Sequence, residues 1–295
     1  SATFAGSITA ILINTPGTSA AAATTFDGYP LAQKGEAGRA LGVAVISSTV
    51  GGIFSVIILC FAAPLLARVA YEFRSPEYFA LTVFGLSMLA SISAGGAVKN
   101  LIGGIFGVWL STIGAERVTG IERFMFGNYE LYEGIHFVPI FIGLFAISEL
   151  LVQSKTVNKI VNTVSMKAVK LPTKEDYKKI WKTILRSCGI GTFIGVLPAE
   201  GATVASMIGY SEARRWSKNK EEFGKGSIEG IAGAEAANNS ATGGAMVPTM
   251  VLGIPGSGTT AIILVGLMVH GLRPGVYLFT EQVEKVYQIF GSMFF

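Results

Sequence analysis

Charged, cysteine and histidine residues are all scarce in this chain. Of its 295 residues only 14% are charged, and there are 2 cysteines and 2 histidines. A soluble domain usually carries about 25% charged residues, so the composition argues against an ordinary soluble fold. Cys60 and Cys188 lie far apart in apolar stretches, which excludes a disulfide framework and a cysteine-based metal site. We expect both to be small buried apolar side chains.

The same scarcity excludes several functional classes. The sequence offers no nucleophile–base pair, no His-Glu metal motif and no aspartate dyad in an apolar segment, so we do not expect an enzyme. We also expect no cofactor and no dedicated metal site. The net charge is +4, but the basic residues gather in one loop between apolar segments. That pattern is typical of membrane topology rather than of nucleic-acid binding.

Apolar residues and glycine, in contrast, are abundant. The chain is 51% hydrophobic, contains 37 glycines and has a mean hydropathy of +0.54. We therefore predict an all-α integral membrane protein. The apolar segments cover residues 6–24, 41–70, 78–98, 101–115, 135–152, 187–210 and 245–269, with a last one near 286. Because the chain begins and ends in apolar segments, we expect a truncated part of a longer polytopic protein.

Two apolar segments are interrupted by related Pro-Gly motifs. The first reads Asn14-Thr15-Pro16-Gly17-Thr18, and the second reads Gly253-Ile254-Pro255-Gly256-Ser257-Gly258-Thr259-Thr260. A Pro-Gly pair breaks a membrane helix and frees backbone N–H and C=O groups. Lipid cannot satisfy these groups, so such a break is tolerated only inside protein or beside a wet cavity. Two related breaks predict a secondary transporter whose site lies at the breaks.

A third interruption, Pro198-Ala199-Glu200-Gly201, divides residues 187–210. Nine Lys and Arg residues precede it between 153 and 186, which places that linker in the cytoplasm by the positive-inside rule. The arm 187–197 would rise only about 16 Å as a helix, against a hydrocarbon core of about 30 Å. We predict a re-entrant hairpin that returns to the cytoplasm. The alternative is one kinked spanning helix, which would place the basic Arg214-Arg215 pair outside.

With this hairpin, the two broken segments run in opposite directions, which predicts inverted repeats. Residues 1–152 would hold the C-terminal part of the first repeat, with the broken helix 6–24 and four further spans. Residues 153–186 would form the basic cytoplasmic linker. Residues 187–295 would begin the second repeat, with the hairpin 187–210, the broken helix 245–269 and a partial span from 286.

The breaks suggest a site for an anion and a cation. The N-terminal end of the second half-helix suits a carboxylate, and the carbonyls that end the first half suit a hard cation such as Na⁺. Hydroxyl and amide side chains add further ligands. No side chain at either break titrates, which favours Na⁺ over H⁺ as the coupling ion. At the hairpin tip, Glu200 is either a cation or proton ligand or a solvated turn residue.

A polar stripe between the hairpin and the second break completes the candidate site. Glu235, Asn238, Asn239 and Thr242 fall on one face of a predicted helix that is otherwise Gly and Ala. The stripe is either part of the transport pathway or a seam of interhelical hydrogen bonds. The candidate substrate- and ion-binding residues are Asn14, Thr15, Pro16, Gly17, Thr18, Pro198, Glu200, Gly201, Thr203, Glu235, Asn238, Asn239, Gly253, Pro255, Gly256, Ser257, Gly258 and Thr259.

Several of these motifs, in this order, resemble a known family. They are residues 6–18, Asp27-Gly28-Tyr29-Pro30-Leu31-Ala32, Ile228-Glu229-Gly230, Glu235-Ala236-Ala237-Asn238-Asn239, Gly253-Ile254-Pro255-Gly256-Ser257, Arg123-Phe124 with Phe126-Gly127, and His270-Gly271-Leu272 with Pro274-Gly275. Together they resemble the large membrane subunit of the tripartite tricarboxylate transporters, the TctA family. Two positions depart from its pattern: the hairpin tip carries Ala199-Glu200, and Ala234 stands where the family has proline.

The resemblance implies a multi-pass subunit of the bacterial inner membrane. Its partners would be a small four-helix membrane subunit, a periplasmic substrate-binding protein, the lipid bilayer and a carboxylate substrate. We therefore expect the translocation subunit of an ion-coupled secondary transporter for tricarboxylates or dicarboxylates, working by alternating access with Na⁺ or H⁺. The alternative is a channel-like or structural subunit of a translocation complex.

Overall fold

The protein is described by a computed structural model and is built almost entirely of helices. The structure describes residues 2–92, 97–116, 119–135, 139–140, 142–147, 151, 154, 171–197 and 201–294. The helices of the first half are α1 (Ala2–Ile13), α2 (Ala22–Leu31), α3 (Ala37–Tyr71), α4 (Ser75–Ile92) and α5 (Ala97–Ser111). Those of the second half are α8 (Lys174–Val196), α9 (Gly201–Trp216), α10 (Ile228–Leu252), α11 (Gly258–Val269), α12 (Val276–Thr280) and α13 (Val283–Ser292).

The remaining regular elements are short. They are the helical turns η1 (Ser19–Ala21), η2 (Ala32–Glu36), η3 (Tyr129–Leu131), η4 (Ile142–Ile147) and η5 (Lys220–Glu222), and the strands β1 (Gly114–Ala115) and β2 (Glu122–Arg123). The two strands form one antiparallel pair, with Gly114 opposite Arg123. Apart from this ladder of two residue pairs, the described chain is helical or irregular, which confirms the predicted all-α class.

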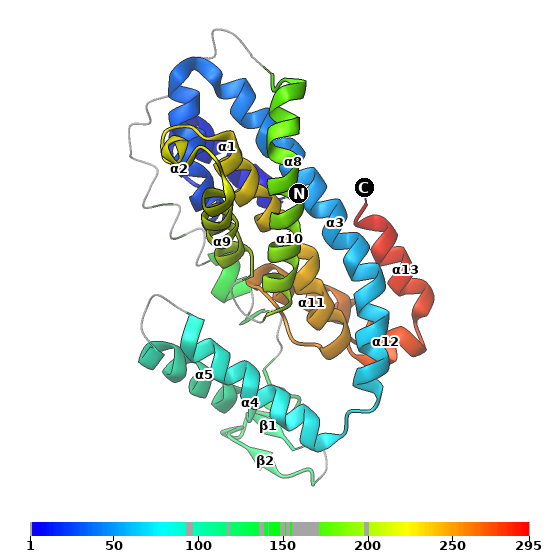
Figure 1. The fold of residues 1–295 in the computed structure, drawn as a ribbon. Helices are drawn as coiled ribbons and strands as arrows, with labels where there is room; N and C mark the ends of the chain where they lie inside the picture. The colour runs from blue at the N-terminus through cyan, green and yellow to red at the C-terminus, as the bar shows by residue number, and fades with distance from the viewer. Residues whose placement is uncertain are drawn as a thin grey trace.

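Helix α10 is the centre of the bundle, and α3, α8 and α9 pack around it (Figure 1). Almost all of its residues are buried, since small side chains let the neighbouring backbones come close. A Cβ atom on Gly51 of α3 would lie 2.5 Å from the carbonyl oxygen of Ala236, and one on Gly209 of α9 would lie 2.5 Å from that of Gly233. The Gly and Ala content of this region therefore serves helix packing.

Helices α8 and α9 form a hairpin whose two outer ends lie at the same end of the bundle. Lys179 in α8 forms a 3.2 Å ion pair with Glu222, which follows α9. At the same end, Arg39 of α3 pairs with Asp176 at 2.5 Å, and the Lys34 ammonium donates to the carbonyl oxygen of Lys225 at 2.6 Å. We call this part of the molecule the basic end.

The predicted hairpin arm was too short. The sequence suggested an arm over residues 187–197, but α8 begins at Lys174 and has 23 residues. Its first turn is fixed by a capping box, in which Thr173 accepts from the backbone N–H of Asp176 and the Asp176 side chain accepts from the backbone N–H of Thr173. The helix therefore rises about 35 Å, not about 16 Å.

The second broken segment also has different bounds. Residues 229–244 and the start of the segment 245–269 are one helix, α10, which continues through Pro248 to Leu252. Among the described residues, one helical run, Ser19–Tyr71, is long and apolar enough to cross a membrane by length and composition. Within it, α3 exposes an apolar ridge at four-residue spacing (Ile53, Ile57, Phe61, Leu65) opposite its buried face. Such a ridge is expected where a helix faces lipid or another apolar partner.

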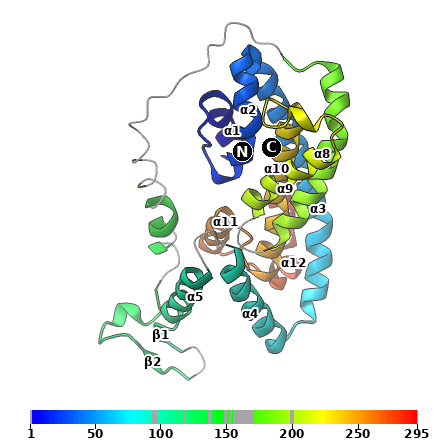
Figure 2. The ribbon, with the colours of Figure 1, turned by 60° about the vertical axis from the view of Figure 1, so that its left-hand side comes forward.

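Helices α4 and α5 pack against each other and lie outside the central bundle. Both views show them at the end of the molecule far from α2 (Figures 1 and 2). Their described apolar side chains are largely exposed, among them Phe79, Leu101 and Ile105. The described residues of the candidate site lie in the break after α1, on α10, in the break between α10 and α11, and in the first turns of α9 and α11.

Candidate functional site

The first helix break lies between α1 and η1 and folds back on α1. The backbone N–H of Gly17 donates to the carbonyl oxygen of Gly6 at 3.1 Å, and Asn14 takes the left-handed backbone conformation at φ 53°. Asparagine adopts this region more readily than most residues. Residues 14–17 are exposed, whereas the hydroxyl oxygen of Thr18 is buried without a hydrogen-bond partner. The break therefore has an exposed part, residues 14–17, and a buried part with the unpaired hydroxyl of Thr18.

The second break joins α10 to α11 and is more tightly held. Gly253 ends α10 in the left-handed conformation at φ 69°, where glycine is favoured. The backbone N–H of Gly256 donates to the Thr249 hydroxyl at 3.3 Å. Ser257 caps α11, since its hydroxyl accepts from the backbone N–H of Thr260 at 3.2 Å. In turn, the Thr260 hydroxyl accepts from the backbone N–H of Ser257 at 2.9 Å. Gly258 and Thr259 follow in the first turn of α11.

The first turn of α9 lies between the two breaks. The Thr203 hydroxyl is 3.0 Å from that of Ser19, which follows the first break. On the other side, a Cβ atom on Gly201 would lie 3.8 Å from the carbonyl oxygen of Gly256 in the second break. The structure thus brings Thr203, Gly201 and both breaks together. Pro198 and Glu200 lie outside the described residues.

Two asparagines of the polar stripe are buried on α10 beside this junction. Asn238 is fully buried, and its amide donates to the carbonyl oxygen of Ala20 at 3.3 Å. The Asn238 side-chain oxygen is buried without a partner. Asn239 donates to the backbone carbonyl of Glu235 at 3.0 Å. The stripe therefore includes an unpaired acceptor close to the first break.

Glu235, the acidic member of the stripe, is fully buried on α10 and is hydrogen-bonded to three other helices. One carboxylate oxygen accepts from the hydroxyls of Ser7 in α1, at 2.5 Å, and of Thr24 in α2. The other accepts from the hydroxyl of Ser48 in α3 at 2.8 Å. These are interhelical hydrogen bonds of the kind that a seam would contain. Glu235 therefore does not face the exposed residues of the first break.

The broken segments α1–α2 and α10–α11 are antiparallel where they touch. Along η1 and α2 the contacts pass from Ala20 to Thr24 to Asp27. Along the partner segment they pass in reverse, from Asn238 to Glu235 on α10 and then to the residues before that helix. Asp27 completes this series, since one of its carboxylate oxygens accepts from the backbone N–H groups of Gly226 and Ser227, each at 2.8 Å.

Several of these polar residues are not among the candidates predicted from the sequence. Ser7, Thr24 and Ser48 are single hydroxyl residues in apolar helices, and nothing in their local sequence distinguishes them from other small residues. Asp27 could have been found, because a carboxylate in an apolar segment is a functional or structural candidate by default. The sequence analysis used it only as part of the family motif.

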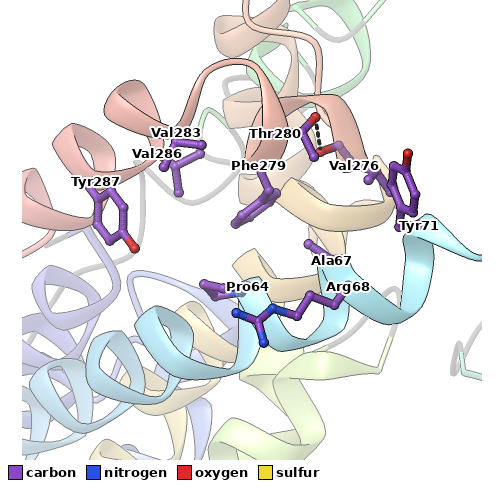
Figure 3. Close-up of a pocket in the computed structure, with 10 residues that line it drawn as sticks. All are labelled: Pro64, Ala67, Arg68, Tyr71, Val276, Phe279, Thr280, Val283, Val286 and Tyr287. Atoms are coloured by element: carbon purple, nitrogen blue, oxygen red, sulfur yellow. Dashed lines mark hydrogen bonds between the residues drawn. The ribbon is translucent and has the colours of Figure 1, made fainter.

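The described residues offer no candidate metal centre. No group of three His, Cys, Asp or Glu residues is placed to hold a metal among them, and both cysteines are free thiols. A cavity of about 310 Å³ lies between the C-terminal end of α3 and helices α12 and α13 (Figure 3). Arg68, Phe279 and Tyr287 are among its lining residues, and no residue of the breaks or of the polar stripe lines it.

Comparison with known proteins decides the family. The family model described as "Tripartite tricarboxylate transporter TctA family" matches residues 1–295. The chain belongs to the TctA family. It is 41% identical over 294 residues to an "Uncharacterized 52.8 kDa protein in TAR-I ttuC' 3'region" of Agrobacterium vitis, a match that covers 99% of this chain and 58% of that relative. An "Uncharacterized protein in TAR-II ttuC' 3'region" of the same species is 41% identical over 103 residues, which are 35% of this chain and 43% of that protein.

TctA membership confirms the resemblance seen in the sequence. This TctA chain spans 58% of the length of its first curated relative. No solved structure matches it. The family is a membrane component of tripartite transporters, which agrees with the apolar helices and supports the expectation that the chain is not an enzyme. The break residues and the polar stripe are thus the candidate site of a TctA-family membrane component.

Proposed function

We propose that this chain forms part of the translocation subunit of an ion-coupled secondary transporter for small carboxylates. The observation that carries the proposal is the meeting of both helix breaks with the first turn of α9, beside the buried amide of Asn238. Broken helices that converge in the interior supply unpaired backbone groups without placing them in lipid. Tricarboxylates or dicarboxylates are the substrate class, as membership of the TctA family suggests.

The chemistry of the breaks supports a carboxylate ligand. The N-terminal ends of α9 and α11 present first-turn N–H groups and the positive end of a helix dipole, which favour an anion. The Thr203 hydroxyl adds a hydrogen-bond donor, and the unpaired oxygens of Thr18 and Asn238 suit a cation. A substrate anion and a coupling cation would therefore be bound by dipoles and neutral side chains. The coupling ion is Na⁺ or H⁺.

The arrangement of the helices supports inverted repeats and a hairpin that returns to the side from which it enters. Because α8 rises about 35 Å, this hairpin is not limited to half of the hydrocarbon core. The segment α1–α2 runs toward the basic end, whereas α10–α11 runs away from it. Both outer ends of the α8–α9 hairpin lie at the basic end, which the positive-inside rule assigns to the cytoplasm. In this proposal, the part that carries the breaks moves relative to a scaffold and gives alternating access from a multi-pass position in the bacterial inner membrane.

The proposed partners are a small four-helix membrane subunit and a periplasmic protein that delivers the carboxylate. Membership of a tripartite transporter family supports both. The polar stripe would then serve two purposes: Asn238 lies at the site, while Glu235 holds the helices that form it. Much of the choice among carboxylates would reside in the binding protein, because backbone N–H and hydroxyl groups suit many of them.

Uptake into proteoliposomes tests this proposal. Full-length protein, its small subunit and its binding protein are reconstituted together, and labelled citrate, succinate and malate are supplied under an imposed Na⁺ or H⁺ gradient. We expect gradient-dependent accumulation above the external concentration. Asn14→Leu or Ser257→Leu should abolish it, because each places a bulky apolar group at a break. Saturable accumulation distinguishes a transporter from a channel, and no accumulation by an assembled complex would refute the proposal.

A further inference from the structure

The junction of α1, α2, α3 and α10 contains a buried carboxylate that the proposed substrate site does not use. Glu235 is 0% exposed. Three of its hydrogen-bond donors come from three other helices, and the fourth is the Asn239 amide one turn along α10, at 3.5 Å. Among the described residues, no Lys, Arg or His lies within ion-pair distance of it. A carboxylate buried without a cationic partner is costly to keep charged, and in membrane segments such groups often carry protons.

The partners of Glu235 suit both of its charge states. Ser7, Thr24 and Ser48 each contribute a hydroxyl group, which can donate a hydrogen bond or accept one by rotating. When the carboxylate is ionised, all three hydroxyls donate to it. When it is protonated, its own O–H can donate to one of them. Lysine, arginine or backbone N–H partners could only donate and would hold the group ionised. The Asn239 amide also only donates, but at 3.5 Å it is the longest of the four contacts.

The other charged groups near this junction lie closer to the basic end. Helix α1 has no titratable side chain over Ala2–Ile13. In α2, one carboxylate oxygen of Asp27 accepts from two backbone N–H groups near the basic end, and its other oxygen is buried without a hydrogen-bond partner. In α3, Arg39 is paired with Asp176 and Glu36.

Helix α10 and the helices that pack on its other sides carry further titratable groups. Glu229 of α10 accepts from the Ser217 hydroxyl at 2.5 Å. Cys188 of α8 lies in an apolar cluster, and Tyr210 of α9 packs edge-on against Phe223. Among the titratable groups of these described helices, Glu235 therefore stands apart. It lies at the junction and accepts hydrogen bonds from hydroxyls of three separate helices.

We propose that Glu235 is the coupling site and that the coupling ion is a proton, an inference that rests on the proposed transport function. The carboxylate takes up one proton from the outer side to form a neutral carboxylic acid, and it releases the same proton to the cytoplasm. Because its hydrogen bonds join α1 and α2 to α10, the change in charge alters the contact between the two broken segments. Proton binding thereby biases the arrangement of the helices that carry the site.

Proton movement in the reconstituted complex tests this inference. The full-length complex is reconstituted with a pH-sensitive dye inside the vesicles, and the probe is the best transported of citrate, succinate and malate. Accumulation under an imposed pH gradient and acidification of the lumen are measured together with carboxylate exchange at equal concentrations on both sides. Glu235→Gln keeps the size of the side chain but cannot take up a proton. It should lose pH-driven accumulation and acidification and retain exchange.

Glu229→Gln is the matched control, because it removes a second largely buried carboxylate from the same helix. We expect it to keep pH-driven accumulation. If Glu235→Gln also keeps accumulation and acidification, the inference is wrong. If the wild type accumulates the probe only under a Na⁺ gradient and without acidification, the proton role fails while the transport function stands. If the wild type neither exchanges nor accumulates any carboxylate, the transport function itself fails.

A second variant covers the case in which Glu235→Gln does not assemble. Ser48→Ala removes one hydroxyl donor to the ionised carboxylate and leaves the other two hydroxyls and the Asn239 amide in place. Since the ionised form loses a hydrogen bond, the pH at which uptake is half-maximal should rise. An unchanged pH profile in an assembled Ser48→Ala complex would contradict the proposal.

Discussion

Asp27 offers the sharpest test of how the two broken segments are held together. One of its carboxylate oxygens accepts from the backbone N–H groups of Gly226 and Ser227, each at 2.8 Å, and the side chain is fully buried. This contact ties α2 to the loop that begins α10. Asp27→Ala would leave both N–H groups without this acceptor, whereas Asp27→Asn keeps an oxygen that can accept from both.

The expected magnitude follows from these two hydrogen bonds. A hydrogen bond to a charged group contributes about 1.5–3 kcal/mol, so losing two costs about 3–6 kcal/mol. Gly226 is partly exposed and can regain water, which favours the lower end of that range. A local loss of about 3 kcal/mol raises the equilibrium constant for local opening roughly 100-fold, because about 1.4 kcal/mol is a factor of ten. Asp27→Asn should lose about 1 kcal/mol, since its bonds are no longer charge-assisted.

Hydrogen exchange measured by mass spectrometry is the appropriate assay. The purified protein is compared in detergent as wild type, Asp27→Ala and Asp27→Asn, using peptides that cover residues 224–232. We expect much faster exchange in the alanine variant and a small change in the asparagine variant, with peptides from α13 unaffected in both. Equal exchange in all three proteins would refute the reasoning, because the two bonds would then not limit local opening.

Two further predictions concern helix packing and pH. Gly51→Ala places a Cβ atom 2.5 Å from the carbonyl oxygen of Ala236 and should cost about 1–3 kcal/mol, whereas Gly52→Ala, with no atom within 4 Å, should be neutral or stabilising in thermal unfolding. Equal melting temperatures would contradict this. The Arg39 guanidinium lowers the pKa of Asp176 below its ordinary value. The stabilisation that this ion pair contributes is therefore complete above about pH 4 and is lost as the pH falls through the lowered pKa of Asp176. The melting temperature of wild type should fall more steeply with acid than that of Asp176→Asn, and parallel curves would exclude the ion pair as the cause.

Local sequence signals located the helix breaks correctly. Pro16-Gly17 and Pro255-Gly256 interrupt the helices as expected, because proline removes a backbone donor and the residues around the pair leave the helical region. The start of α8 also has a local signal, since Thr173 and Asp176 have the spacing of a capping box. Hydropathy alone places this helix start too late, because the first turns of the helix are rich in lysine.

Helix continuity through Pro248 could not be predicted in the same way. Proline in a helix interior usually kinks or ends it, yet α10 continues for four more residues. Its neighbours are close-packed around it, and the buried cluster of Met246, Val247, Met250 and Val251 is held by α3, α12 and α13. Tertiary packing therefore decides the end of this helix, at Gly253 rather than at the proline.

The amino-acid sequence alone determined the helical class, the positions of both breaks and the family. These features depend on composition, on proline and glycine stereochemistry and on motifs of consecutive residues. Only the tertiary structure decided what the polar stripe contacts. Glu235 meets Ser7, Thr24 and Ser48, which are 228, 211 and 187 positions away in the chain. No local pattern records such pairings, because they depend on how α1, α2 and α3 pack on α10 once the whole bundle has formed.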